Sequence, residues 1–198
     1  MSTVKSIYRN LLFLSGGEII SKILQFALMV YAARFLDKAS FGKFSFALSL
    51  SFIAIITADL GINQLLIREI ARDKNRANKY FINAFVIKLV FALITYLFII
   101  LLLNGLDYPK DTRHIVYLIW IFTIISTFTD LFYSIFRAFE RMFYDSLIKT
   151  LRMIILTSAG LYVLSHGYGV TVFSAIFIVV EALMVITAYL IARKNFIK

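Results

Sequence analysis

The chain has 198 residues, of which 61% are apolar and 16% are charged. Soluble domains average roughly 45–50% apolar and about 25% charged residues, so a water-soluble fold of this length could not bury so much apolar surface. The sequence has no cysteine and a single proline, which excludes disulfide-rich, cysteine-ligated zinc and proline-rich proteins. Composition therefore predicts an integral membrane protein.

Six apolar stretches alternate with short polar connections. A helix needs roughly 20 apolar residues to cross the hydrocarbon core of a bilayer, and each stretch reaches about that length. They are residues 10–35, 44–67, 80–104, 115–137, 146–165 and 171–192. We therefore predict an all-α integral membrane protein in which residues 1–198 form a single six-helix lobe.

Basic residues gather on one side of the predicted spans. Of the 21 Lys and Arg residues, 14 lie on the side of the N-terminus and five on the opposite side, while Lys22 and Lys88 lie deeper within spans. The 14 include Lys149 and Arg152 of the fifth span, which are near enough to the cytoplasmic face to snorkel. Cytoplasmic loops of membrane proteins are enriched in Lys and Arg. Both termini are therefore predicted to be cytoplasmic, and the net charge of +10 requires no nucleic-acid partner.

The first predicted span carries a polar face. Ser15, Glu18, Lys22 and Gln25 follow the spacing of one side of a helix, and Lys22 lies about 18 Å along the span, near mid-bilayer. Ionisable residues at that depth normally face a bundle interior or a water-filled cavity. Either Glu18 and Lys22 neutralise each other against a neighbouring helix, or this face lines a cavity where Lys22 attracts an anionic group.

Four further ionisable residues lie inside other predicted spans, and they are candidates for lining the same cavity. They are Asp59, Lys88, Asp130 and Glu181. Structural explanations compete with this function, because Lys88 is able to snorkel to the surface and Ser134 or a basic neighbour can satisfy Asp130. Gly61, just after Asp59, can serve close helix packing. Glu181 has no charged neighbour within one turn, so its charge needs a partner from another helix or must be removed by a proton.

Sequence motifs of common enzymes are missing. The two histidines, His114 and His166, lie at the predicted outer ends of spans, and the sequence contains no zinc-protease helix, P-loop or glycine-rich dinucleotide motif. We therefore predict a protein that is not an enzyme and that uses no cofactor and no metal.

Motifs in the first part of the chain resemble a known family. They are Ala33-Arg34-Phe35-Leu36, Phe41-Gly42-Lys43-Phe44-Ser45-Phe46-Ala47, Asp59-Leu60-Gly61-Ile62 and Arg68-Glu69-Ile70-Ala71-Arg72. Over about residues 7–79 this pattern resembles the N-terminal part of polysaccharide biosynthesis proteins, the O-antigen (Wzx-type) flippases of the multidrug/oligosaccharidyl-lipid/polysaccharide exporter superfamily. The hydropathy pattern extends the resemblance to Lys198.

The resemblance implies a MATE-like fold with two six-helix lobes around a central cavity. It also implies that a polyprenyl-diphosphate-linked oligosaccharide is moved between the leaflets of the plasma membrane by alternating access. With six spans, this chain would supply the N-terminal lobe without a C-terminal one, and would pair with a second lobe or with polysaccharide synthesis proteins.

Two alternatives remain open from the same residues. A cation-coupled multidrug exporter would need an acidic cavity, which Glu18, Asp59, Asp130 and Glu181 keep possible. The other alternative is a non-transporting scaffold subunit of a polysaccharide assembly complex.

Overall fold

The structure is a computed structural model that describes the backbone of residues 3–196 and the side chains of residues 8, 12–53, 55, 56 and 59–196. All regular structure in this part of the chain is helical, which confirms the predicted all-α class. The elements are α1 (Thr3–Phe35), α2 (Lys38–Asp59), α3 (Ile62–Arg72), a 3-10 turn η1 (Lys74–Arg76), α4 (Ala77–Gly105), α5 (Lys110–Ala138), α6 (Met142–Ser165) and α7 (Val170–Asn195).

Five helical segments of the described chain are long and apolar enough to cross a membrane. They are Leu12–Phe35, Lys74–Gly105, Lys110–Ala138, Met142–Ser165 and Val170–Asn195. These segments correspond to the first, third, fourth, fifth and sixth predicted spans. The chain is therefore a multi-pass membrane protein.

The second predicted span, residues 44–67, is not one continuous helix. Helix α2 ends at Asp59, and the next two residues, Leu60 and Gly61, have positive φ angles of 37° and 82°. This left-handed backbone turns the chain out of α2 before α3 begins at Ile62. The prediction of an uninterrupted helix was wrong because apolar residues continue on both sides of the break, so hydropathy does not reveal it.

Helix α2 starts at a side-chain cap. The Asp37 carboxylate accepts hydrogen bonds of 2.9 Å from the backbone amides of Ala39 and Ser40, which are free at the first turn of a helix. Hydrogen bonding from Ser40 holds the pKa of Asp37 below its ordinary value. The two-residue connection between α1 and α2 therefore reverses the chain with its polar groups satisfied.

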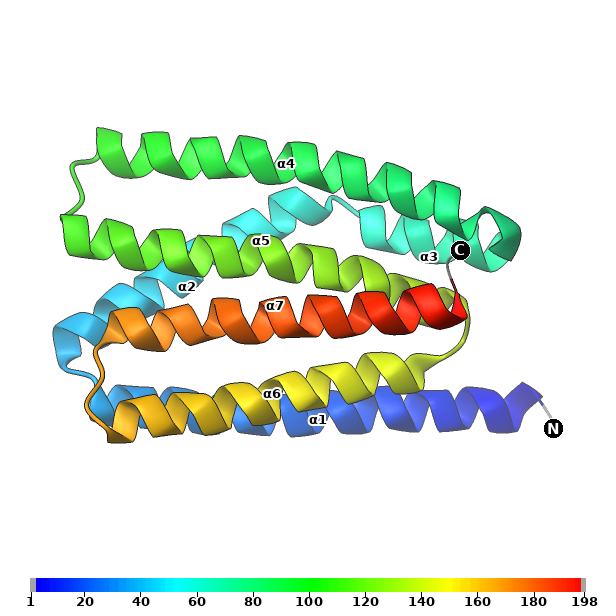
Figure 1. The fold of residues 1–198 in the computed structure, drawn as a ribbon, viewed down its shortest axis with the longest axis horizontal. Helices are drawn as coiled ribbons and strands as arrows, with labels where there is room; N and C mark the ends of the chain where they lie inside the picture. Colours follow the sequence, from blue (N-terminus) through cyan, green and yellow to red (C-terminus); the bar gives the residue numbers. More distant parts are fainter. Residues whose placement is uncertain (1–2, 197–198) are drawn as a thin grey trace.

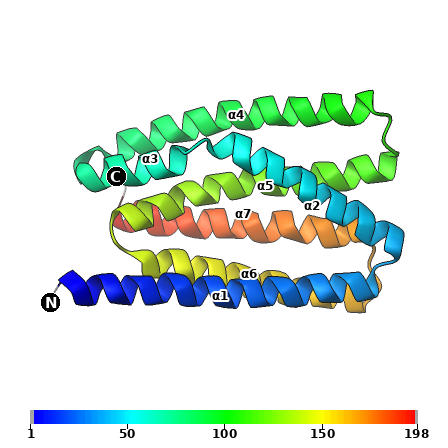
Figure 2. The same ribbon diagram turned by 180° about the vertical axis from the view of Figure 1, so that it is seen from behind.

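The long helices run side by side, with α1 parallel to α6 and α5 parallel to α7, while α2 crosses them obliquely (Figures 1 and 2). The start of α1, helix α3, the α5–α6 connection and the end of α7 lie at one end of the bundle, which we call the basic end (Figure 1). The α1–α2, α4–α5 and α6–α7 connections lie at the opposite end.

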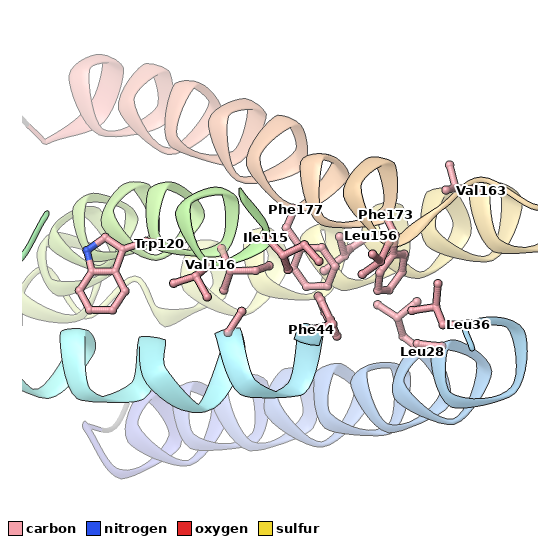
Figure 3. Packing of buried hydrophobic residues seen from close by; sticks show 14 of the residues in the cluster. Leu28, Leu36, Phe44, Ile115, Val116, Trp120, Leu156, Val163, Phe173 and Phe177 are labelled. Atoms are coloured by element: carbon pink, nitrogen blue, oxygen red, sulfur yellow. The ribbon is translucent and has the colours of Figure 1, made fainter. Parts of the chain in front are cut away.

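Buried apolar side chains form two clusters stacked along the bundle. The first, toward the opposite end, includes Leu28, Phe44, Ile115, Trp120 and Phe173 (Figure 3). The second, toward the basic end, is built around side chains of α3, α5 and α7; its members include Leu66, Ile70, Phe132, Phe136 and Ala192. The long helices pass from one cluster to the other, so the segment between the clusters lies partway along the spans.

Candidate functional site

A layer of charged and polar side chains lies between the two apolar clusters. Along α5 it contains Thr123, Thr127, Thr129 and Asp130, which fall between Trp120 of the first cluster and Leu131 of the second. On α7, Glu181 likewise falls between Val180 and Met184 of the two clusters. We call this the charged layer. It replaces apolar packing partway along the spans, which is costly in a membrane and typical of a functional site.

A cavity of about 260 Å³ opens into the charged layer between α1, α5 and α6. Four predicted site residues line it, namely Glu18, Lys22, Gln25 and Asp130. The remaining lining residues are Ser21, Ser126, Tyr133, Lys149, Arg152 and Met153. The polar face predicted on the first span therefore lines the same cavity as Asp130 of the fourth span.

Lys149 connects α1 to the interior of the bundle. Its Nζ lies 3.6 Å from Glu18 Oε2 and 3.2 Å from Asp145 Oδ1. Asp145 is fully buried, and its other oxygen accepts a 2.6 Å hydrogen bond from Nε of Arg137. Two cations thus compensate this carboxylate, because a buried charge is stable only when it is paired.

Arg152, which also lines the cavity, forms a second ion pair with a buried carboxylate. Its Nη1 donates to Glu181 Oε2 at 3.2 Å, and the hydroxyl of Thr129 donates to Oε1 of the same carboxylate at 2.7 Å. Glu181 is completely buried, and its ion-pair partner comes from α6. Of the two alternatives given for Glu181, a partner from another helix or a proton, the structure shows the partner from another helix.

Lys22 differs from the other two cations of the cavity because its side chain is largely exposed. Its side chain is 72% exposed, and its only ion pair among the described residues is a long contact of 4.0 Å with Glu18, which is itself 47% exposed. Glu18 has Lys149 as a second partner. The Glu18–Lys22 pair is therefore present, but it does not pack Lys22 against another helix.

Lys88 and Asp59 lie in the charged layer but not in the cavity lining. Lys88 is 1% exposed; its Nζ lies 3.3 Å from Asp59 Oδ1 and donates to the Thr127 carbonyl at 3.0 Å. Snorkelling of Lys88 to the surface is thus wrong, because α4 buries this amine against α2 and α5. The contact ties the last residue of α2, just before the break, to the bundle.

Asp130 is close enough to Lys88 and to the two cations of α6 to interact with all three. Lys88, Lys149 and Arg152 attract its carboxylate electrostatically. The hydroxyl of Ser134 donates to the backbone carbonyl of Asp130, not to the carboxylate. Ser134 therefore does not satisfy the carboxylate of Asp130.

Sequence reasoning missed Lys149 and Arg152 because both were treated as cytoplasmic residues within snorkelling reach. The available signal was the spacing of Asp145, Lys149 and Arg152, which places three charges on one face of α6 at intervals of four and three residues. Tyr133 was missed as well, since it belongs to no polar stripe. Its ring lies under the amine of Lys149, 5.2 Å from the centroid.

Two hydroxyls of the cavity have no hydrogen-bond partner among the described residues. They belong to Ser21 and Tyr133, which are only 8% and 3% exposed. A buried polar group without a partner costs free energy, so such groups normally bind water or a ligand. The described residues contain no group of three or more metal-ligating side chains. The cavity thus combines cations, carboxylates and two hydroxyls that are free to bind water or a ligand.

The apolar helices, with a charged layer and a cavity at the depth of the spans, define a multi-pass α-helical membrane protein with an internal polar site. The chain belongs to the polysaccharide biosynthesis protein family, whose profile matches residues 7–198. Members of this family are generally transporters and not enzymes. Searches of curated proteins and of solved structures gave no significant match.

Proposed function

We propose that this chain is one lobe of a flippase that moves lipid-linked oligosaccharide across the plasma membrane for polysaccharide biosynthesis. The charged cavity between α1, α5 and α6 would then form one wall of the translocation pathway. Residues 1–198 act as a single six-helix lobe in this proposal, with α2 making the second crossing. The basic end faces the cytoplasm, as the distribution of Lys and Arg favours.

The exposure of Lys22 is the observation that carries this proposal. Lys22 lies about 15 Å from Leu12 and about 20 Å from Phe35 along α1, so its 72% exposed side chain is at the middle of the span. A charge facing lipid at that depth costs roughly 2.5–3.5 kcal/mol on insertion scales. The exposed face of α1 with Glu18, Lys22 and Gln25 therefore borders an aqueous pathway or a second lobe.

The charges of the cavity favour a diphosphate as the group that is recognised. Lys149 and Arg152 are held by carboxylates on the bundle side, whereas Lys22 remains available. Phosphate oxygens accept charge-assisted hydrogen bonds from such amines, and the unpartnered hydroxyls of Ser21 and Tyr133 are further donors. The lipid tail of the substrate would stay in the bilayer beside the exposed apolar face of α1.

Binding and movement of the substrate test this proposal. The purified chain is titrated with polyprenyl diphosphate, and flipping of a labelled lipid-linked oligosaccharide is measured in proteoliposomes that hold the two-lobe assembly. We expect Lys22→Gln to weaken diphosphate binding about tenfold or more, since it removes one charge-assisted contact. Lys38→Gln, an exposed lysine at the start of α2, is the matched control and should bind normally.

The Glu18→Gln/Lys22→Gln double variant separates substrate binding from charge balance. If Lys22 only neutralises Glu18, the double variant should fold and flip normally. If Lys22 contacts the diphosphate, the double variant should fold normally and still fail to flip. Normal flipping by a well-folded double variant removes Lys22 from the site.

Two other functions would give different results in the same assays. A cation-coupled multidrug exporter, suggested by Asp130 in the cavity lining, would lose drug export in Asp130→Asn and would not bind polyprenyl diphosphate. A scaffold subunit would co-purify with a synthase or polymerase, and cells lacking it would flip the lipid normally.

A further inference from the structure

Helix α3 is set apart from the spans by the break at Leu60 and Gly61. Its 11 residues extend about 16 Å, which is too short to cross a bilayer. Leu66 and Ile70 are buried against the bundle, whereas Arg68 and Arg72 are exposed. A short helix with one apolar and one basic face, placed at the end of the spans, is typical of the membrane interface.

Two hollows adjoin each other between α3 and the start of α4. The first, of about 230 Å³, is mostly apolar, and its wall includes Ile62, Leu65, Leu66, Ala84 and Ile87. The second, of about 480 Å³, is polar and is lined by Glu69, Arg72, Asp73, Arg76 and Tyr80. Glu69 and Tyr80 line both, so the hollows form one groove that is apolar at one end and lined by acidic and basic side chains at the other.

The polar part of the groove contains one cation, Arg72, that no carboxylate of the described residues neutralises. Its two carboxylates are already paired, Glu69 with Arg68 at 3.0 Å and Asp73 with Arg76 at 3.1 Å. Arg72 and Lys79 have no ion-pair partner among the residues that the structure describes. Clusters of basic residues next to the apolar spans attract anionic lipids, at about 1 kcal/mol for each Lys or Arg.

We propose that this groove binds an anionic glycerophospholipid of the leaflet that covers the basic end. The phosphate would lie against Arg72, which lines the polar hollow, with the exposed Lys79 next in sequence to the lining residue Tyr80. One acyl chain would follow Leu65 and Ile87, whose side chains are 52% and 45% exposed. A soluble anion would use only the polar hollow, and a neutral lipid only the apolar one. A phospholipid with a negative headgroup is the occupant that uses both. The inference does not depend on the transport function proposed above.

Native mass spectrometry of the intact chain in detergent tests this site. Phosphatidylglycerol and phosphatidylcholine of equal chain length are added, and the bound fractions are compared. We expect a preference for phosphatidylglycerol that falls about 30-fold in Arg72→Gln/Lys79→Gln, because two cations are lost. Both residues are exposed, so the thermal unfolding of this variant should match that of the unchanged protein.

The matched control is Arg193→Gln/Lys194→Gln, which removes two exposed charges from the end of α7 at the same end of the bundle. It should keep the preference for phosphatidylglycerol; an equal loss in this control would show general surface attraction and overturn the proposal. If glycerol phosphate displaced phosphatidylglycerol as effectively as the lipid itself does, the groove would bind anions without using its apolar part, and the proposal would be overturned. Displacement of phosphatidylglycerol by much lower amounts of polyprenyl diphosphate would make it a substrate entry, and would also overturn the proposal.

Discussion

The buried carboxylate of Glu181 shows how strongly a single residue of the charged layer depends on its partner. Arg152→Met would leave this fully buried group with only the hydroxyl of Thr129. Removing one member of a buried ion pair typically costs about 3–5 kcal/mol, and we expect a loss of that size in the free energy of unfolding in detergent. Because the second change removes the unpaired charge, Arg152→Met/Glu181→Gln should recover most of it.

The control for this prediction is Arg193→Gln. Arg193 lies exposed near the end of α7, and surface substitutions usually change stability by no more than about 0.5 kcal/mol. A double variant as unstable as Arg152→Met would contradict the assignment, since the loss would then come from packing and not from an unpaired carboxylate.

At the scale of residues, the sequence was informative where charges followed a helical period. The stripe with Glu18, Lys22 and Gln25 was predicted from spacing, and the structure brings it to one cavity with Asp130, which was predicted from its place inside a span. Which charges pair could not be predicted, because the Lys88–Asp59 and Arg152–Glu181 contacts join different helices. Such contacts depend on how the helices pack, which spacing within one helix does not determine.

The break between α2 and α3 gives a prediction for one element. Gly61 has a φ of +82°, and a Cβ placed there would meet no atom within 4 Å. Gly61→Ala should therefore measure backbone strain alone, and we expect it to lower the free energy of unfolding by about 1–2 kcal/mol.

Gly42 is the matched control, because it lies within α2 and its added Cβ would also meet no atom within 4 Å. Gly42→Ala should raise stability by roughly 0.5–1 kcal/mol, since alanine loses less conformational freedom in a helix. Thermal unfolding in detergent should show that Gly61→Ala lowers stability and Gly42→Ala raises it, which would place the break at Gly61 and not within α2. A stabilising Gly61→Ala would mean that α2 continues through it.

The close approach of α1 and α6 gives a second prediction for the elements. A Cβ at Gly17 would lie within 3.3 Å of the backbone Cα of Ser146 and closer still to its side chain. Overpacking of this kind typically costs about 1–3 kcal/mol, so Gly17→Ala should destabilise the bundle by that amount. At Gly16, one residue earlier, a Cβ would meet nothing within 4 Å, and Gly16→Ala should not destabilise it. Equal effects of the two changes would contradict the contact.

At the scale of elements, hydropathy predicted five spans close to their observed positions, because a membrane helix is defined by length and composition. It could not predict the break after Asp59, where the turn depends on the backbone angles of Leu60 and Gly61 and on the contact from Lys88. The same glycine was interpreted as a helix-packing residue, although a Cβ there would meet no other helix.

For the whole molecule, the cysteine-free sequence makes the membrane orientation directly testable. Lys110→Cys places a thiol at the end opposite the basic end, and Asn75→Cys places one between α3 and α4; both residues are exposed. A membrane-impermeant maleimide should label Lys110→Cys in intact cells and Asn75→Cys only after permeabilisation. The reverse pattern would place the basic end outside the cytoplasm and contradict the positive-inside assignment.

The pairing of α1 with α6 sets an order of events during synthesis. The hydroxyl of Thr157 donates to the carbonyl of Leu24, a contact between residues 133 positions apart, and α6 lies along α1 in both views (Figures 1 and 2). Ribosomes add about 5–20 residues per second, so α1 waits roughly 7–27 seconds for the helix that covers its side. During that time Glu18 lacks Lys149 and has only Lys22, four residues away, to balance it. The local Glu18–Lys22 contact is therefore expected to form before the contact between Glu18 and Lys149, which has to wait for α6.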